Sequence, residues 1–128
     1  MPPIIHLVRH AQGVHNLSVD NHHILDPELT PLGEDQSRAL GSAFSGTVNP
    51  ELILSSPMRR TLQTALLAFP AHFKNGLKLT AWPDVQEVAD VPCDIGREIA
   101  VIKAEFADQP VDFSLVEDGW QLKVRLYN

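Results

Sequence analysis

The sequence predicts a single α/β domain in which a largely parallel sheet lies between layers of helices, a three-layer α/β/α arrangement. The chain has 128 residues, a length that fits one domain. Short apolar segments alternate along it with segments of helical periodicity, an order typical of βαβ units. No internal repeat or Gly/Ser-rich linker divides the sequence. The domain is therefore expected to cover residues 1–128.

Four short apolar segments are the predicted strands: residues 4–8, 52–54, 77–81 and 111–115. The first two are expected to be buried, and the third, which alternates, to be exposed or edge-like. Ligands of such sheets sit outside the carboxyl ends of the strands, so residues that follow a strand deserve a search for chemistry.

Three helices are predicted from their start and stop signals. Proline is favoured at the first helical position, and Ser, Thr or Asp just before it. The helices are expected from Thr30-Pro31 to about Phe44, from Ser56-Pro57 to the residue before Pro70, and from the cap Asp94 through Phe106.

The composition excludes some partners. The formal net charge is −6, and an acidic chain repels nucleic acid and anionic membranes at long range. Cys93 is the only cysteine, so an internal disulfide is impossible and a reducing compartment fits. The apolar N-terminal segment is too short for a signal peptide or a membrane span. The sequence therefore predicts a cytoplasmic protein with neither nucleic acid nor membrane as its partner.

The first candidate site follows the first predicted strand, where Arg9 and His10 begin a run that ends at Asn16. A neutral imidazole can attack phosphorus when its other nitrogen donates a hydrogen bond to a carbonyl group. Gln12 adds an amide, and Gly13 lets the backbone approach a ligand closely. A bare Arg-His pair also fits a salt-bridged strand end, and for the dipeptide alone that interpretation is favoured.

A second candidate segment, residues 55–65, also follows a predicted buried strand and opens a helix. Free backbone amides and the helix dipole favour an anion there. Arg60 lies about 200° around the helix from Met58, so it points away from the apolar stripe. Its planar guanidinium suits bidentate contact with phosphate, whereas Arg59 is expected to be a solvated surface residue.

Four motifs follow one another along the chain. They are Arg9-His10, Asn16, Leu29-Thr30-Pro31-Leu32-Gly33 with Gln36, and the run from Ser56 to Ala65. In this order they resemble the histidine phosphatase superfamily of phosphoglycerate mutase-like enzymes, in particular its uncharacterised fungal and plant members. Ala11 replaces the glycine that the family has after its histidine. Four ordered matches are far more specific than any one alone.

The resemblance implies a metal-independent mechanism without a cofactor, in which His10 takes the phosphoryl group as a phosphohistidine. Arg9 and Arg60 would neutralise the transferring oxygens. The substrate-binding residues would be Asn16, Gln12 and Gly13. The partner would be a small phosphorylated substrate or a phosphate ion.

Glu87 matches the glutamate that protonates the leaving oxygen in the family. Such an acid needs a raised pKa, which a pocket walled by Trp82 and Val85 would supply. On spacing alone, a solvated loop carboxylate is the favoured interpretation of Glu87.

The remaining histidines carry less information. His22 and His23 lie near two aspartates, but their spacing matches no metal-site signature, and a solvated loop is favoured. His15 lies in the motif loop, and neither the pattern nor the resemblance assigns it a role.

The sequence departs from the family after Trp120. The family has a second histidine, usually in a His-Gly pair, whereas no such pair occurs here and no histidine follows His72. We therefore expect a truncated histidine phosphatase fold. Residues 121–127 alternate apolar and polar side chains, so they are expected to form a strand through which the chain could form a homodimer.

Two functions stay open at this point. The first is phosphatase-type phosphoryl transfer through His10, with reduced activity because the second histidine is missing; a mutase is less expected. The second is a non-catalytic member of the fold that binds phosphate or a protein partner.

Overall fold

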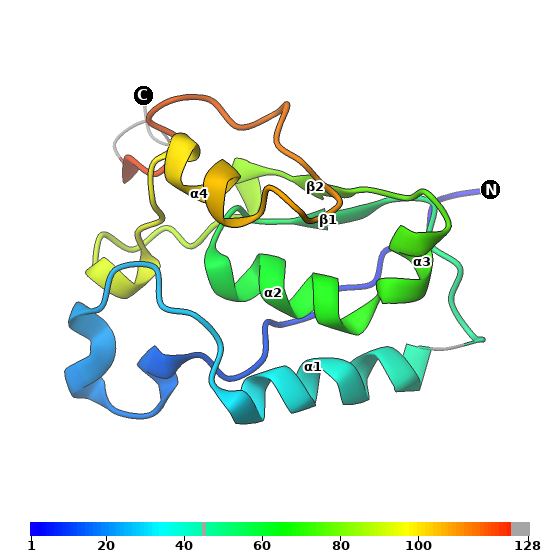
Figure 1. The fold of residues 1–128 in the computed structure, drawn as a ribbon, viewed down its shortest axis with the longest axis horizontal. Helices are drawn as coiled ribbons and strands as arrows, with labels where there is room; N and C mark the ends of the chain where they lie inside the picture. Colours follow the sequence, from blue (N-terminus) through cyan, green and yellow to red (C-terminus); the bar gives the residue numbers. More distant parts are fainter. Residues whose placement is uncertain (45, 124–128) are drawn as a thin grey trace.

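The computed structural model describes residues 1–44 and 46–123, which contain a parallel sheet of three strands. They are β1 (Ile53–Ser55), β2 (Leu79–Ala81) and β3 (Val111–Asp112), in the order β1-β2-β3. Within the sheet, Ile53 pairs with Leu79, and Leu79 pairs with Val111. Figure 1 shows the sheet on one side of the two longest helices. The predicted α/β class with a parallel sheet is confirmed.

The position of β2 in the sheet differs from the prediction. It was expected to be exposed or at an edge, but it lies between the other two strands, and Leu79 and Ala81 have no exposed surface. An alternating pattern shows only that one face of a strand is buried. It carries no information about how many neighbours pair with the strand, and here β3 covers the second edge of β2.

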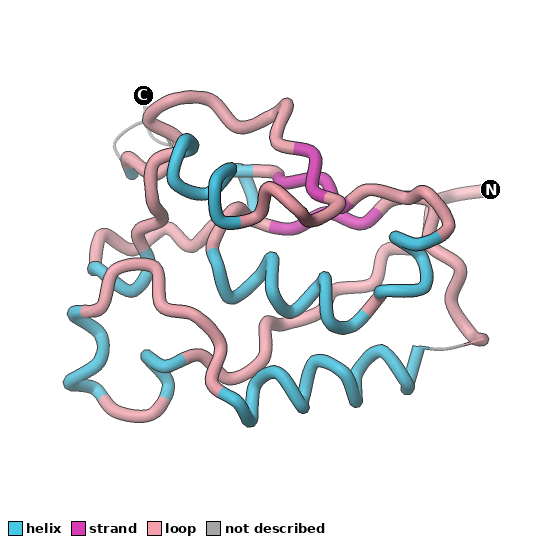
Figure 2. The backbone as a smooth tube through the Cα atoms, viewed as in Figure 1, coloured by secondary structure: helices cyan, strands magenta, loops and turns pink. Residues whose placement is uncertain are grey.

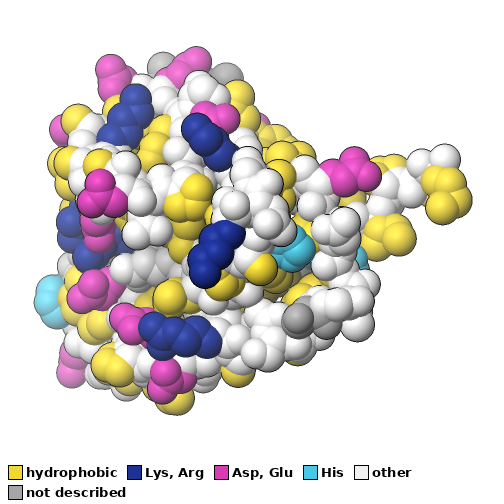
Figure 3. Space-filling model, turned by 45° about the vertical axis from the view of Figure 1, so that its right-hand side comes forward, with side chains coloured by type: hydrophobic (Ala, Val, Ile, Leu, Met, Phe, Trp, Pro, Cys, Tyr) yellow, Lys and Arg dark blue, Asp and Glu magenta, His cyan; other side chains and the backbone are white. Residues whose placement is uncertain are grey.

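The expected buried strand at residues 4–8 is wrong. The segment pairs with no strand in the described part of the chain, and Ile4, Ile5 and Leu7 are 83%, 77% and 93% exposed. Figure 2 shows it as loop up to the N-terminus, and in Figure 3 hydrophobic side chains gather on an arm that projects from the body. An apolar run gives a buried strand only where neighbouring strands and a covering layer exist.

The helices form two layers beside the sheet. Helix α1 (Pro31–Phe44) packs on α2 (Arg59–Ala68), and α2 packs on β1 and β2 (Figure 1). A Cβ atom at Gly41 would lie 1.9 Å from the carbonyl oxygen of Ala68, so a glycine is needed where the two helices cross. The other helical segments are α3 (Pro70–Lys74), α4 (Ile99–Glu105) and short 3₁₀ turns at Val14–Asn16, Val19–His23, Pro83–Val85 and Pro92–Asp94.

Helix α1 has the predicted bounds, whereas α2 and α4 begin later than predicted. Ser56 does not cap α2; its hydroxyl lies 2.8 Å from the hydroxyl of Thr61, and the helix begins at Arg59. Asp94 does not cap α4, because its carboxylate binds Arg60 and a 3₁₀ turn holds its backbone. In both places another contact takes the side chain that local preference assigns to a cap: a local one with Thr61 for Ser56, and a long-range one with Arg60 for Asp94.

The core joins α2, the sheet, α4 and the C-terminal segment. Its members are Ile53, Met58, Leu62, Ala65, Leu79, Ala81, Ile102, Phe106, Val116 and Trp120. No helix among the described residues has the length and apolar character needed to cross a membrane.

The expected C-terminal strand is wrong as far as it can be followed. Residues 121–123 are not in a strand, Lys123 is buried, and residues 124–128 lie outside the described part of the chain. The homodimer through this strand stays a prediction.

The N-terminus of α2 is capped by a buried carboxyl group from a distant segment. Asp26 has no exposed surface, and its Oδ1 accepts a 2.9 Å hydrogen bond from the backbone N–H of Arg59. Its Oδ2 finds no partner among the described residues. Burial raises the pKa of Asp26 to about 6, because the charged form loses its hydration. The φ of +46° is the left-handed conformation that Asp and Asn tolerate best.

The Asp26→Asn variant isolates the pH dependence of this buried carboxyl group. Between the ordinary pKa of 3.8 and about 6, the folded state binds more protons than the unfolded chain. Stability from this group is thus present below pH 3.8 and lost as the pH rises through 6. The unfolding free energy of the variant minus that of the wild type should increase by about 3 kcal/mol between pH 3.5 and pH 7. Urea unfolding at each pH measures this difference, and the exposed Asp108→Asn is the control. A pH-independent difference for Asp26→Asn would contradict the assignment.

Candidate active site

The loop that carries His10 is fastened to the start of α1. The carbonyl oxygen of Gln12 accepts hydrogen bonds from the backbone N–H and the hydroxyl of Thr30, at 3.0 and 3.4 Å. The N–H of Gln12 donates to Oε1 of Gln36 at 3.0 Å, and Gly13 forms an isolated antiparallel bridge with Leu29. Backbone pairing with the residues before α1 therefore holds the loop, although no sheet strand precedes it.

A close approach of two backbones explains the glycine in the Leu-Thr-x-x-Gly motif. A Cβ atom at Gly33 would lie 2.1 Å from the carbonyl oxygen of Gln12, which is less than any real contact allows. The hydroxyl of Thr30 also accepts a 3.0 Å hydrogen bond from the N–H of Gly33. The motif thus docks the His10 loop on the first turn of α1.

Helix α2 holds the same loop from its other side. The N–H of Ala11 donates to the hydroxyl of Thr64 at 3.1 Å, and that hydroxyl donates to the carbonyl oxygen of Arg60 at 2.7 Å. The side-chain oxygen of Gln63 accepts from the N–H of Leu29 at 2.9 Å. The second motif therefore contributes polar side chains that position the loop, in addition to Arg60 itself.

His10 has the geometry of a neutral nucleophile. Its Nδ1 lies 2.7 Å from the carbonyl oxygen of Ala11, an acceptor that requires a proton on Nδ1 and so leaves the lone pair on Nε2. Burial lowers the pKa of His10 below 6.5, and the cations Arg60 and Arg9 act in the same direction. The hydrogen bond to Ala11 and the carboxylate of Glu87 act against them. Burial therefore favours the uncharged imidazole.

A hollow of about 280 Å³ lies beside this imidazole. Its lining residues are Arg9, His10, Ala11, Gln12, Asn16 and Gln36. Oδ1 of Asn16 accepts a 2.9 Å hydrogen bond from the N–H of Gly13, which aims the other side of the amide, its NH₂ group, away from the backbone. The hollow thus combines a guanidinium, an imidazole and amide donors, a set suited to an anion.

Arg60 is the most deeply buried charge near the site, with 1% of its surface exposed. Its guanidinium donates to the carboxylates of Glu87 and Asp94, at 2.9 and 3.2 Å, and to the carbonyl oxygen of Cys93 at 2.7 Å. Its Nε finds no partner among the described residues. Two carboxylates therefore already compensate the guanidinium that the sequence assigned to phosphate.

The structure brings the predicted site residues to one region, in two layers. Arg9, His10 and Asn16 surround the hollow, whereas Arg60 and Glu87 do not line it and form an ion pair behind it. The two layers are close enough for Arg60 and Glu87 both to act on the charge of His10. The roles of these residues in catalysis stay predictions.

The expected surroundings of two residues are corrected by the structure. Trp82 and Val85 are 36% and 50% exposed, so they do not form a closed apolar wall for Glu87. Arg59 is not a solvated residue, because it forms ion pairs with Glu28 at 3.2 Å and Glu105 at 2.8 Å. Both partners of Arg59 are distant in the sequence, so residue spacing could not predict these ion pairs.

Sequence reasoning missed His15 as a component of the site. This imidazole is 7% exposed, its centroid lies 5.6 Å from that of His10, and burial lowers its pKa to about 4. A Cβ atom at Gly13 would lie 2.6 Å from its Nδ1, so the glycine leaves space for the ring. The sequence offered one signal for a buried His15, which is the glycine two residues before it. The same glycine also fits a close approach of the backbone to a ligand, so the signal was ambiguous.

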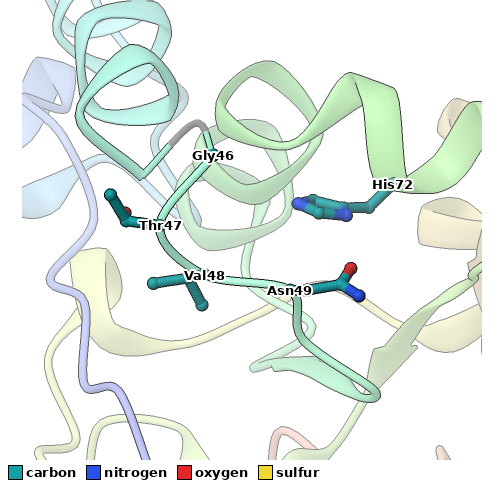
Figure 4. A pocket seen from close by; sticks show the side chains of 5 residues that line it. All are labelled: Gly46, Thr47, Val48, Asn49 and His72. Carbon is teal, nitrogen blue, oxygen red and sulfur yellow. The ribbon is translucent and has the colours of Figure 1, made fainter.

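A second hollow, of about 320 Å³, lies away from this chemistry. The residues that line it are Gly46, Thr47, Val48, Asn49 and His72. Figure 4 shows the imidazole of His72, on α3, across from the loop that follows α1. The residues that line it include no arginine or lysine, so this hollow lacks the cationic side chains that bind an anion strongly. The described residues also hold no cluster of three or more His, Cys, Asp or Glu side chains that could bind a metal ion.

Comparison with known proteins identifies the family. The sequence model of the histidine phosphatase superfamily (branch 1) matches residues 5–122. The chain therefore belongs to the histidine phosphatase superfamily. Phosphoglycerate mutase-like protein 1 of Arabidopsis thaliana is 41% identical, with 94% of this chain and 56% of that protein aligned. Another phosphoglycerate mutase-like protein of the same plant is 32% identical, over 88% of this chain and 54% of the relative.

Another relative agrees with this assignment, and one solved structure shares the fold. A probable phosphatase of Schizosaccharomyces pombe is 30% identical, over 80% of this chain and 49% of that protein. The crystal structure of the ecdysone phosphate phosphatase from Bombix mori, in complex with tungstate, superposes with a TM-score of 0.55 at 20% identity. It covers 81% of this chain and 40% of that one, and it supports the fold alone. The chain spans about half the length of these relatives.

Two glycines of α1 separate general stability from the integrity of the site. Gly33→Ala and Gly41→Ala both place a methyl group against a backbone carbonyl, at Gln12 and at Ala68, so each should destabilise the fold by about 1–3 kcal/mol. Only Gly33→Ala displaces the His10 loop. Isothermal titration with orthovanadate, an anion that mimics phosphate, should therefore show weaker binding for Gly33→Ala than for Gly41→Ala. Equal affinities in the two folded variants would contradict the role assigned to Gly33.

Proposed function

We propose that this chain hydrolyses small phosphate esters through a phosphohistidine on His10. One observation carries the proposal: the carbonyl of Ala11 fixes the proton of His10 on Nδ1, so that Nε2 keeps its lone pair beside a hollow lined with anion-binding groups. Membership of the histidine phosphatase superfamily and relatives named as phosphatases support the same reaction class. The substrate class is a phosphate monoester.

The reaction has two steps. Nε2 of His10 attacks phosphorus, the bond between phosphorus and the ester oxygen breaks, and the leaving oxygen takes a proton from Glu87. Water then attacks the phosphohistidine and gives a proton back to the Glu87 carboxylate, the bond between phosphorus and Nε2 breaks, inorganic phosphate leaves, and the imidazole is restored. The guanidiniums of Arg9 and Arg60 and the amide of Asn16 stabilise the charge on the transferring oxygens.

The contacts of Arg60 set a condition on this mechanism. The carboxylate of Glu87 has to leave the guanidinium and take up a proton from solvent before it can serve as a proton donor, and the phosphoryl oxygens then take its place on Arg60. The carbonyl of Cys93 and the carboxylate of Asp94 hold the guanidinium during the exchange.

Turnover is expected to be low. The family's second histidine is missing from the sequence, and loss of one donor at a developing charge typically reduces the rate by about 10²–10³-fold. A second candidate function is phosphate binding without catalysis in the hollow beside Arg9, His10 and Asn16. It is supported by the ion pairs of Arg60, because a guanidinium that is already compensated is not free to stabilise a transferring phosphoryl group.

His10→Ala decides between these two functions. The purified chain should hydrolyse 4-nitrophenyl phosphate slowly, and His10→Ala should abolish that activity, whereas His72→Ala, outside the site, should leave it unchanged. Acid-labile phosphate should appear on the wild-type chain during turnover and be absent from His10→Ala. Orthovanadate binding without any His10-dependent turnover would instead support the non-catalytic function.

Glu87→Gln tests the proton donor. Alkyl phosphates have basic leaving groups that require protonation, so their hydrolysis should slow by about 10²-fold. Hydrolysis of 4-nitrophenyl phosphate should change little, because its leaving group is acidic. The exposed Glu51→Gln is the matched control. Equal loss on both substrates would remove Glu87 from the role of proton donor.

A further inference from the structure

A buried lysine from the C-terminal segment holds the main chain at Glu87. Lys123 is 7% exposed, and its Nζ donates to the backbone carbonyl oxygen of Glu87 at 2.6 Å. It also donates to Oε1 of Gln86 at 2.9 Å. The two acceptors of this ammonium thus lie on neighbouring residues, Gln86 and Glu87, and Glu87 is the predicted proton donor.

The path from Lys123 back to the core is well fastened. The amide of Gln86, which is 7% exposed, also donates to the carbonyl oxygen of Trp120 at 2.9 Å. Trp120 is 5% exposed, and its indole N–H donates to the carbonyl oxygen of Arg97 at 3.0 Å. A Cβ atom at Gly96 would lie 2.1 Å from the Trp120 ring, so the indole fits tightly against this backbone. Residues 120–123 thus connect the hydrophobic core with the loop that carries Glu87.

Glu87 is therefore held at two points by two cations. Lys123 fixes its backbone, and Arg60 binds its carboxylate at 2.9 Å. Of the two contacts, the proposed reaction breaks only the one to Arg60. A backbone that stays fixed while the carboxylate moves limits the positions that the acidic group can reach, which is what proton transfer to a leaving oxygen requires.

We propose that Lys123 is a positioning residue for Glu87: its ammonium fixes the Gln86-Glu87 backbone so that the side chain of Glu87, once freed from Arg60 and protonated, reaches the leaving oxygen of the substrate. This inference rests on the proposed function, in which Glu87 is the proton donor. It adds that the C-terminal segment takes part in the site, although it lines no part of the hollow beside His10.

The chemistry of the contact fits positioning better than simple packing. Burial lowers the pKa of Lys123, because an ammonium group removed from water is costly. The carboxylates of Glu87, Asp94 and Asp90 counteract this effect. An unbranched apolar side chain such as Met would fill similar space without that cost, but it would leave the carbonyl of Glu87 without its donor.

The test compares two substrates within each variant of the full chain. The ratio of kcat/KM for an alkyl phosphate to that for 4-nitrophenyl phosphate reports proton donation, and it is independent of the fraction of folded protein. Lys123→Met should lower this ratio about tenfold, because a displaced acid loses part of the roughly 10²–10⁴-fold that general acid catalysis supplies. In a Glu87→Gln background, Lys123→Met should lower it no further. The exposed Lys103→Met is the matched control and should leave the ratio unchanged.

The outcomes separate this inference from the proposed function. A normal ratio in Lys123→Met, together with a lowered one in Glu87→Gln, overturns the role of Lys123 alone. An unchanged ratio in Glu87→Gln overturns the proton donor and the role of Lys123 with it. If Lys123→Met does not fold, Lys123→Arg replaces it, because a planar guanidinium cannot reproduce the ammonium contacts, and an unchanged ratio there also overturns the inference.

Hydrogen exchange provides a readout that needs no turnover. Backbone amides of residues 84–90 should exchange faster in folded Lys123→Met than in the wild type. In the control Lys103→Met they should exchange at the wild-type rate. Unchanged exchange in Lys123→Met would show that the lysine does not hold this loop, whether or not the chain is an active phosphatase.

Discussion

The buried guanidinium of Arg60 is the interaction on which the rest of the site depends. A charge with 1% exposure is tolerated only when hydrogen bonds and counter-charges surround it, and Arg60 obtains them from Cys93, Glu87 and Asp94. This requirement draws the long loop between β2 and α4 against the N-terminus of α2. Through its own carbonyl oxygen, which accepts from Thr64, the same residue also connects with the backbone of Ala11. Arg60 therefore links the loop of the predicted nucleophile, His10, with the loop of the predicted acid, Glu87.

The parts of the site that the sequence predicts well are those set by local chemistry. The start of α1 at Pro31 follows from the backbone preference of proline, and the structure shows it where it was expected. Thr30 and Gly33 act within a few residues of each other, so a fixed motif records them. Motifs of this kind are visible because the residues that cooperate in space are also close in the sequence.

Long-range contacts account for most of what could not be predicted. Asp26 caps α2 from more than thirty positions away. The local pattern names Ser56 as that cap, but its hydroxyl makes a local contact with Thr61 instead. Lys123 reaches the backbone of Glu87 from the end of the described chain. The apolar run at residues 4–8 shows the reverse error, since burial was inferred from composition although the described chain supplies no neighbouring strand. Composition reports what a segment can bury, and only topology decides whether a partner is present.

The ion pairs around Arg60 also bear on how an anion can enter. A phosphate group that approached an uncompensated guanidinium would gain the full attraction, but such a buried charge would destabilise the fold before any ligand arrived. Glu87 solves this problem if its carboxylate leaves as the phosphoryl group arrives, because the local charge then changes least. Asp94 and the carbonyl of Cys93 keep the guanidinium in place during that exchange. The backbone contact from Lys123 lets one side chain move without loosening the loop. In the proposed mechanism, a stable resting state and a movable acid are compatible because Glu87 is held at two independent points.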